Sequence, residues 1–200
     1  MLLSNKWDEN FSDDDYVYGT EPNEFIKEYS EMIPANSEVG CFAEGEGRNA
    51  IHLAKLGHRV TSFDNSEVGL EKTKKLAAMN DVEVLTHKVD LTKEKVEENS
   101  FDAAIMVFGH VSKEDQDYLM KNMFDSVKKG GHIFIEVYSE EQVDYGTGGP
   151  KTKEMLYRPV DIMRWTSSFK RLHFYSGEAE RVEGKRHDGL GHVIQVVARK

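Results

Sequence analysis

The stretch from Val39 to Asp64 limits the possible folds of this chain more than any other part of the sequence. A short apolar run leads into Gly45 and Gly47, an amphipathic helical pattern follows, and a second β-rich run ends at Asp64. This order predicts a strand, a glycine turn, a helix that stops at Gly57 and a parallel strand. Because open α/β sheets bind ligands at the carboxyl ends of their strands, the turn and the acid are expected to share a nucleotide-type pocket.

Alternating β-rich and helical patterns continue through the rest of the chain. The last two β-rich runs have no full helix between them, which is typical of a hairpin. We therefore predict an α/β, Rossmann-like sheet of seven mostly parallel strands, with helices on both faces and a C-terminal antiparallel hairpin. The further strands are expected at 82–89, 101–108, 132–138, 171–175 and 192–198.

Residues that cap or stop helices place the predicted helices between these strands. Polar caps are expected to begin each helix, and proline or glycine to end it. A further short helix is expected at 159–165. One helix is expected to start at Thr20 and to end before Pro34, and another to start at Asn65 or Ser66. A later helix is expected to start at Ser112, with Asp115 in its first turn, and to end at Gly130 and Gly131.

Two segments without a regular pattern are expected to border the site. Residues 1–19 are polar with scattered aromatic side chains, which favours an N-terminal arm over the site, with a frayed tail as the alternative. The loop at 139–150 is rich in glycine, which favours a lid or a substrate wall. No linker divides the chain, so residues 1–200 are expected to form a single domain.

Composition argues against several classes of partner. The net charge of −10 and the isoelectric point near 5.3 disfavour a surface for nucleic acid or an anionic membrane, since both are bound mainly through lysine and arginine. The single cysteine, Cys41, is expected to be a buried strand residue, and the histidine spacing predicts no metal site. Without a bilayer-spanning run or a leader pattern, we expect a cytoplasmic protein with small-molecule ligands.

The glycine turn formally matches the dinucleotide fingerprint, since Gly45, Gly47 and Ala50 are spaced as G-x-G-x-x-A. An NAD-dependent oxidoreductase is therefore one alternative. Glu44 and Glu46 flank the first glycine, however, and would oppose a pyrophosphate. S-adenosylmethionine has no phosphate and carries a sulfonium and an amino group. The acidic turn therefore favours S-adenosylmethionine.

Acids and amides near the strand ends have the chemistry that the rest of the cofactor needs. Asp64 is expected to accept hydrogen bonds from both ribose hydroxyls, and Asp90 to accept one from the adenine amino group. Asn49 is a candidate for holding the methionine carboxylate.

Three side chains are candidates for the chemistry itself. His110 follows the fourth strand at the ligand edge and would act as a base or orient an acceptor, with a merely hydrogen-bonded loop histidine as the alternative. Tyr18 and Tyr145 come from glycine-containing loops and would offer hydroxyls or aromatic faces to a cation, with ordinary surface packing as the alternative.

Taken together and in order, these motifs resemble the class I S-adenosylmethionine-dependent methyltransferases, and more closely the small tellurite-resistance-type branch. The resemblance covers most of the chain and rests on the order and spacing of the motifs. The segments that carry it are 18–23 (YGTEPN), 44–49 (EGEGRN), 63–64 (FD), 89–91 (VDL), 101–103 (FDA), 129–131 (KGG) and 145–150 (YGTGGP).

The resemblance implies methyl transfer from S-adenosylmethionine to a small, soft acceptor such as a thiol, tellurite or selenite. It would place Gly45 and Gly47 behind the methionine moiety and residues 108–111 beneath the sulfonium. Cys41 and Ala43 depart from the family, which usually has an acid and a glycine there, so a non-catalytic cofactor-binding protein is a further alternative. The residues expected to bind the cofactor are Glu44, Gly45, Gly47, Asn49, Asp64, Asn65, Asp90, Leu91 and Phe108.

Overall fold

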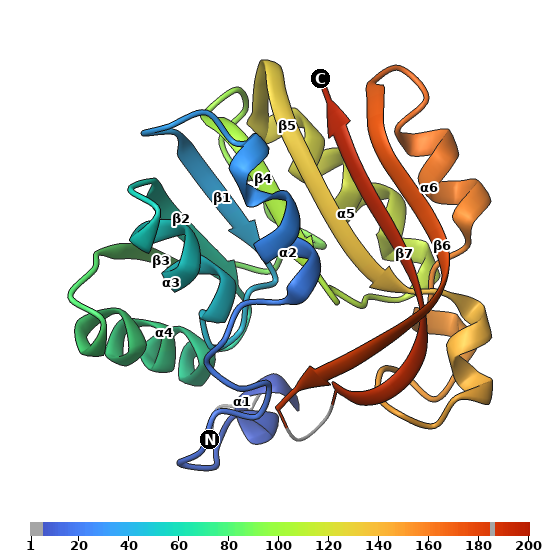
Figure 1. The fold of residues 1–200 in the computed structure, drawn as a ribbon, viewed down its shortest axis with the longest axis horizontal. Coiled ribbons are helices and arrows are strands. Elements are labelled where there is room, and N and C mark those ends of the chain that lie inside the picture. The colour runs from blue at the N-terminus through green and yellow to red at the C-terminus, as the bar shows by residue number, and fades with distance from the viewer. Residues whose placement is uncertain (1–5, 185–186) are drawn as a thin grey trace.

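The computed structural model describes residues 6–184 and 187–200, and the strands of this part of the chain form one mixed sheet (Figure 1). The strands are β1 (Glu38–Phe42), β2 (Arg59–Asp64), β3 (Val84–Lys88), β4 (Phe101–Val107), β5 (Val127–Tyr138), β6 (Lys170–Glu183) and β7 (His187–Arg199). Their order is β3-β2-β1-β4-β5-β7-β6. Strands β1 to β5 run parallel, and β7 runs antiparallel to both of its neighbours. The predicted sheet and its C-terminal hairpin are confirmed.

Helices cover both faces of the sheet, as Figure 1 shows. The helices are α1 (Lys6–Asn10), α2 (Glu24–Tyr29), α3 (Arg48–Lys55), α4 (Glu67–Met79), α5 (Lys113–Ser126) and α6 (Pro159–Trp165). Side chains of α2, α3 and α4 form one apolar layer with Cys41, whereas those of α5 and α6 form the opposite layer with Phe42. Successive strand residues point to opposite faces, so each strand contributes to both layers. Cys41 is fully buried, as expected.

Helix α2 begins later than predicted. Its N-cap is Asn23 rather than Thr20, and the Asn23 side chain accepts a hydrogen bond from the Ile26 N–H at 3.1 Å. Long-range contacts hold Asn23 in this position, because its amide nitrogen donates to Glu136 and Glu183. The last turn tightens into a short 3-10 helix at Ser30–Met32. Ser66, in contrast, caps α4 as predicted, accepting from the Gly69 N–H at 3.0 Å.

Helix α5 ends earlier than predicted, and strand β5 begins directly after it. Gly130 and Gly131 therefore lie inside the strand and do not stop the helix. A side chain on Gly131 would lie 2.6 Å from the backbone oxygen of Asp102, so glycine allows the close approach of two strands. Ser112 is the N-cap residue of α5, but its hydroxyl donates to the Asp115 carboxylate and accepts no hydrogen bond from the helix backbone, so the predicted capping box is wrong.

The C-terminal hairpin is much longer than predicted. Strands β6 and β7 pair along their whole lengths, up to Glu183 opposite His187. Only the C-terminal half of β7 lies beside β5. This half carries the apolar pattern that sequence analysis detects. The remainder extends past the sheet and carries mostly exposed residues, so hydrophobic periodicity does not reveal it. Its tip reaches the N-terminal arm, because Gly184 lies against Gly19.

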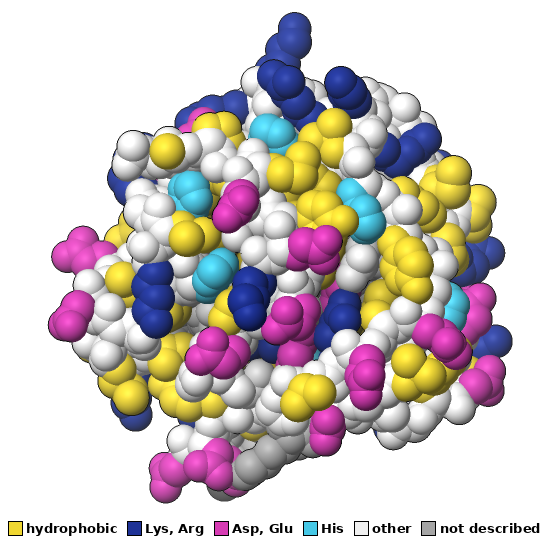
Figure 2. Space-filling view, in the orientation of Figure 1, with side chains coloured by type: hydrophobic (Ala, Val, Ile, Leu, Met, Phe, Trp, Pro, Cys, Tyr) yellow, Lys and Arg dark blue, Asp and Glu magenta, His cyan; other side chains and the backbone are white. Residues whose placement is uncertain are grey.

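The surface carries charges of both signs. On the face shown in Figure 2, basic side chains gather along the upper edge and acidic ones are spread over the lower half. Among the described residues, no helix combines the length and apolar character that crossing a membrane requires.

Candidate active site

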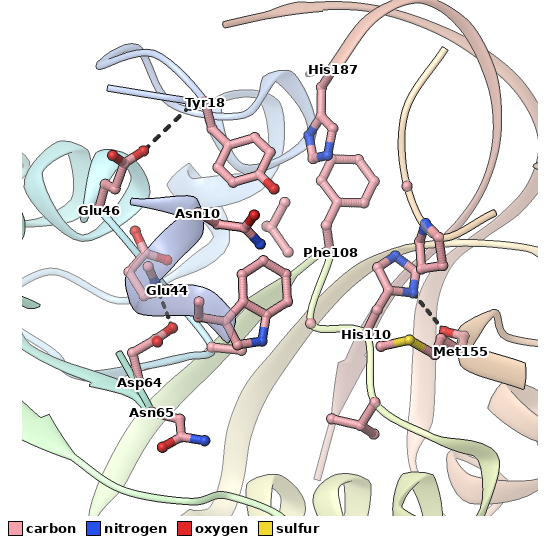
Figure 3. A pocket seen from close by; sticks show the side chains of 18 of the residues that line it. Asn10, Tyr18, Glu44, Glu46, Asp64, Asn65, Phe108, His110, Met155 and His187 are labelled. Atoms are coloured by element: carbon pink, nitrogen blue, oxygen red, sulfur yellow. Dashed lines mark hydrogen bonds between the residues drawn. The ribbon is translucent and has the colours of Figure 1, made fainter. Parts of the chain in front are cut away.

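A cavity of about 840 Å³ opens at the carboxyl ends of β1, β2 and β4, where the strand order reverses. In Figure 3 the acidic residues on one wall face Phe108 and His187 on the other. Cavities of this size hold cofactor-sized ligands. The structure does not bring Gly47 or Tyr145 to the cavity wall. The predicted site residues that do line it are Tyr18, Glu44, Gly45, Asn49, Asp64, Asn65, Asp90, Leu91, Phe108 and His110.

The glycine turn after β1 contains three residues with left-handed backbone conformations: Ala43, Gly45 and Gly47, with φ of 51°, 66° and 93°. A side chain on Gly47 would lie 2.7 Å from Thr73 of α4. Gly47 therefore packs the turn onto a helix rather than facing the cavity. Ala43 stands where the resemblance expects a glycine and adopts a conformation that disfavours its Cβ.

The Glu44 carboxylate caps the N-terminus of α3. One of its oxygens accepts from the backbone N–H groups of Asn49 and Ala50, each at 2.8 Å. Burial raises the pKa of this carboxyl to about 7, although these bonds and the charge of Arg48 act against the rise. The Asn49 side chain accepts from the Asn23 N–H at 2.9 Å and donates to Glu44 at 3.4 Å. Asn49 thus braces the turn.

Asp64 ends β2 and supports the same turn. Its two oxygens accept from the backbone N–H groups of Gly45 and Ser66, each at 2.8 Å. Burial raises the pKa of Asp64 to about 6 in spite of these bonds. The backbone N–H of Asn65 is a third donor to this carboxylate, whose two oxygens offer about four lone-pair sites, so acceptor capacity for a ribose hydroxyl remains. Asn65 follows on the same wall of the cavity (Figure 3).

Asp90 lies at the edge of the cavity and stabilises a local turn. Its oxygens accept from the Thr92 backbone and hydroxyl and from the Lys93 ammonium, the last at 2.7 Å. An adenine amino group would have to share this carboxylate with those donors. Leu91 is buried beside it and adds apolar surface for a flat ring.

Glu46 holds the N-terminal arm in place. Its carboxylate accepts from the Val17 N–H and pairs with the Lys72 ammonium, both at 2.8 Å. Lys72 also donates to the backbone oxygen of Asp15. Figure 3 shows Glu46 directed toward the backbone of Tyr18. Because Lys72 compensates the charge of Glu46, Glu44 alone makes the turn acidic toward a ligand.

His110 lines the cavity, but both of its ring nitrogens are engaged. Nδ1 donates to the Met155 backbone oxygen at 2.9 Å, and Nε2 accepts from the Tyr138 N–H at 3.4 Å. Burial lowers the pKa of this imidazole to about 4. The arrangement matches the hydrogen-bonded loop histidine better than a general base. Its ring continues a stack with Tyr138 and Phe108.

The two candidate tyrosines lie in different places. Tyr18 reaches the cavity wall, and its ring centroid lies 4.6 Å from that of His187. Tyr145 lies outside the lining, where its hydroxyl donates to Glu178 at 2.9 Å. The glycine-rich segment that follows it, residues 146–150, does line the cavity, at the place where a lid or a substrate wall is predicted.

A buried ionic network that sequence reasoning missed supports the back of the cavity. Glu136 of β5 accepts hydrogen bonds from Arg181, Gln195 and Asn23. Arg48, the first residue of α3, pairs with Glu183 of the hairpin at 2.6 Å. Glu136 was a signal of this network in the sequence, since a charged residue within an apolar strand needs buried partners.

His187 was also missed as a site residue. It packs against Tyr18 and against Phe108, whose ring centroid lies 4.4 Å away. Burial, together with the charges of Arg48 and Arg181, lowers the pKa of His187 far below its usual range, so the ring is neutral. The sequence shows this histidine only as one of several in the late strands, and no spacing marks it.

The residues present fit S-adenosylmethionine better than a dinucleotide. Two carboxylates, the half-buried Glu44 and the buried Asp64, line the cavity and have raised pKa values. An ammonium and a ribose diol are suitable partners for them, whereas a pyrophosphate would meet the Glu44 charge directly. Aromatic rings of Tyr18 and Phe108 border the same space and would accommodate a cation. Among the described residues, no cluster of side chains is suited to hold a metal ion.

Comparison with known proteins points the same way. Residues 38–131 match the family described as Methyltransferase domain. A relative from Haemophilus influenzae, named probable S-adenosyl-L-methionine-dependent methyltransferase TehB, is 28% identical over 156 residues, which cover 74% of this chain. The chain spans about half of that relative's length, 53%.

Solved structures share the fold. The crystal structure of TehB from Haemophilus influenzae has a TM-score of 0.76 at 18% identity, over 90% of this chain and 62% of that one. An S-adenosylmethionine-dependent methyltransferase from Methanosarcina mazei has a TM-score of 0.70 at 15% identity, over 90% of this chain and 98% of that one. At these identities the likeness concerns the fold alone.

Proposed function

Since the chain belongs to the class I S-adenosylmethionine-dependent methyltransferases, we propose that it transfers the methyl group of S-adenosylmethionine to a small, soft nucleophile. The observation that carries the proposal is a pair of carboxylates, the half-buried Glu44 and the buried Asp64, beside an aromatic wall in one cavity. Glu44 suits the cofactor's amino group and Asp64 its ribose. Leu91 supplies apolar surface for its adenine.

The cofactor supplies a methyl group that is already activated by positively charged sulfur. The protein therefore has to align the reactants, exclude water and stabilise positive charge. Phe108 and Tyr18 line the cavity and would present aromatic faces to a cation. The arm and residues 146–150 cover the same space from other sides.

The two histidines in the cavity support an acceptor that needs little help from a base. His110 has both nitrogens engaged, and the pKa values of His110 and His187 lie below the usual range, chiefly because of burial. Thiolates, selenite and tellurite are nucleophilic at neutral pH without proton removal by the protein. We therefore favour these acceptors over amines and alcohols.

The proposal extends to location and partners. We expect the enzyme to act in the cytoplasm on a small molecule, without a nucleic-acid or membrane partner. The net charge of −10 supports this, because phosphate-rich surfaces repel an acidic protein.

Transfer of a labelled methyl group from S-adenosylmethionine tests the proposal. Purified protein is incubated with the labelled cofactor and, separately, with small thiols, selenite, tellurite, amines and alcohols. We expect methylated product with at least one of the soft nucleophiles. Transfer only to amines or alcohols would refute the acceptor class, and no binding of the cofactor would refute the function.

A further inference from the structure

Strand β6 is the last strand of the sheet, and one of its two edges is open. It forms a ladder with β7, and within residues 6–184 and 187–200 no other strand pairs with it. It runs from Lys170 to Glu183, which is longer than most strands in globular proteins. An open edge presents backbone N–H and C=O groups that pair readily with another strand. This edge is therefore able to bind a further strand.

The features that usually protect an edge strand are confined to the start of β6. Lysine, proline and bulges keep open edges apart. Here Lys170 is the first residue of the strand, and the register shift in the ladder lies between Arg171 and His173. Residues 173–180 contain no lysine or proline, and their pairing with β7 is regular. This segment is therefore free to extend the sheet by one strand.

Apolar side chains border the open edge. Leu172 and Phe174 of β6 are 38% and 36% exposed. Val160 and Met163 of α6 are 61% and 45% exposed. The guanidinium of Arg171 donates to the backbone oxygen of Met163 at 3.3 Å, so α6 lies beside the start of β6, as Figure 1 also shows. Association along this edge would remove apolar surface of both elements from water, which is favourable.

The exposed charges of β6 are separated by sign along the strand. Lys170 and Arg171 stand at its start, and Glu178 and Glu180 stand beyond its middle. The ladder with β7 places Arg171 and both glutamates on the same face of the strand. An antiparallel copy of β6 would bring opposite charges together, whereas a parallel copy would bring like charges together. The charge pattern is therefore complementary to itself.

We propose that two copies of this chain associate through β6, as antiparallel neighbours related by a two-fold axis near Tyr175. Such an interface uses the same patch on both copies and requires a patch that is complementary to itself. An axis at this position brings Arg171 of each copy level with Glu178 and Glu180 of the other. The sheet then continues from one copy into the other. The proposal is independent of methyl transfer, because no residue of β6 lines the cavity.

Two charge-reversed variants test the complementarity. One carries Lys170→Glu and Arg171→Glu, so that its β6 strand is acidic at both ends. The other carries Glu178→Lys and Glu180→Lys, so that its β6 strand is basic at both ends. Neither variant is complementary to itself, but each is complementary to the other. Thermal unfolding of each variant shows that it is folded before its mass is compared.

A substitution at the centre of the interface tests the surface itself. Phe174→Lys places a positive charge next to the two-fold axis, where the two copies would repel each other. Leu85→Lys is the matched control, because Leu85 is a 66% exposed apolar residue of β3, the strand at the opposite end of the sheet.

Sedimentation velocity over a series of concentrations measures the mass of the particle. We expect twice the mass of one chain for the wild type and for Leu85→Lys at micromolar concentration. Phe174→Lys and each charge-reversed variant are expected to raise the dissociation constant of the dimer at least about tenfold, because each change occurs twice in the dimer. An equimolar mixture of the two charge-reversed variants is expected to dimerise again.

Three results would overturn the proposal. A wild-type protein that stays monomeric throughout the series, or forms particles larger than a dimer, does not have this interface. Wild-type dimers that persist in Phe174→Lys as they do in Leu85→Lys form through another surface. Charge-reversed variants that dimerise as the wild type does, or that do not associate when mixed, contradict the antiparallel pairing of β6.

Discussion

At the scale of single residues, Asp64 is where the predicted ribose contact can be tested. Its carboxylate supports the turn through Gly45 and still has acceptor capacity toward the cavity. We predict that Asp64→Ala weakens S-adenosylhomocysteine binding by about 1.5–3 kcal/mol, the contribution of a charged hydrogen-bond pair. Calorimetry measures the change, and Asp81→Ala, an exposed acid in a distant turn, is the control. Unchanged affinity in Asp64→Ala would show that the ribose lies elsewhere.

Ala43 tests the backbone geometry of the turn. With φ of 51°, this residue holds a conformation that costs a non-glycine residue about 1–2 kcal/mol. Glycine removes that cost but increases the freedom of the unfolded chain, so we predict that Ala43→Gly stabilises the protein by up to about 1 kcal/mol. Urea unfolding measures it. Ala50→Gly in α3, where alanine is helical, should instead destabilise by about 1 kcal/mol. If Ala43→Gly and Ala50→Gly lower the free energy of unfolding equally, the backbone of Ala43 is not strained.

Glu44 makes stability depend on pH. The folded state raises its pKa from 4.5 to about 7, chiefly by burial. The folded state therefore binds the Glu44 proton more tightly than the unfolded state does. The contribution of this group to the free energy of unfolding is full below pH 4.5 and is lost as the pH rises through 7. Glu44→Gln remains neutral and lacks this dependence.

We predict that the free energy of unfolding of the wild type falls relative to Glu44→Gln by about 2.5 kcal/mol between pH 5 and pH 8. Because both proteins contain the same other titrating groups, the effects of those groups on stability cancel in this comparison. Urea unfolding at several pH values measures the difference. A difference that does not change with pH would mean that Glu44 is not desolvated.

At the scale of elements, the attachment of the N-terminal arm to α4 depends on one buried pair. Lys72 pairs with Glu46 and holds the backbone of Asp15, whereas Lys74 on the same helix makes only an exposed pair. We predict that Lys72→Met leaves Glu46 buried without its partner, destabilises the protein by about 3 kcal/mol and exposes the arm to proteolysis. Lys74→Met should change neither property. Equal proteolysis rates in the two variants would contradict the attachment.

The elements that sequence analysis predicts well are those with a strong local pattern. The apolar strands, the Ser66 cap and the helix at Pro159–Trp165 follow from periodicity and capping chemistry. The start of α2 and the end of α5 do not, because Asn23 and Gly131 are set by long-range contacts. The outer half of the hairpin carries no apolar alternation, so its length could not be predicted.

At the scale of the whole molecule, the site forms where distant segments of the chain converge. Topology brings the strand ends together, which is why Glu44, Asp64 and Phe108 could be placed at the cavity from the sequence. His187 could not be recognised, because its place in the cavity depends on the hairpin folding back onto the arm. Tertiary contacts, and not local chemistry, select this residue.

The most direct test of the central claim is calorimetric titration of the cofactor-free protein with S-adenosylhomocysteine and, separately, with NAD. The Glu44 carboxylate at the cavity wall and the absence of a phosphate in the sulfur cofactor predict binding of S-adenosylhomocysteine with a dissociation constant in the micromolar range, about −8 kcal/mol. They also predict no measurable binding of NAD. Binding of NAD without binding of S-adenosylhomocysteine would contradict the account.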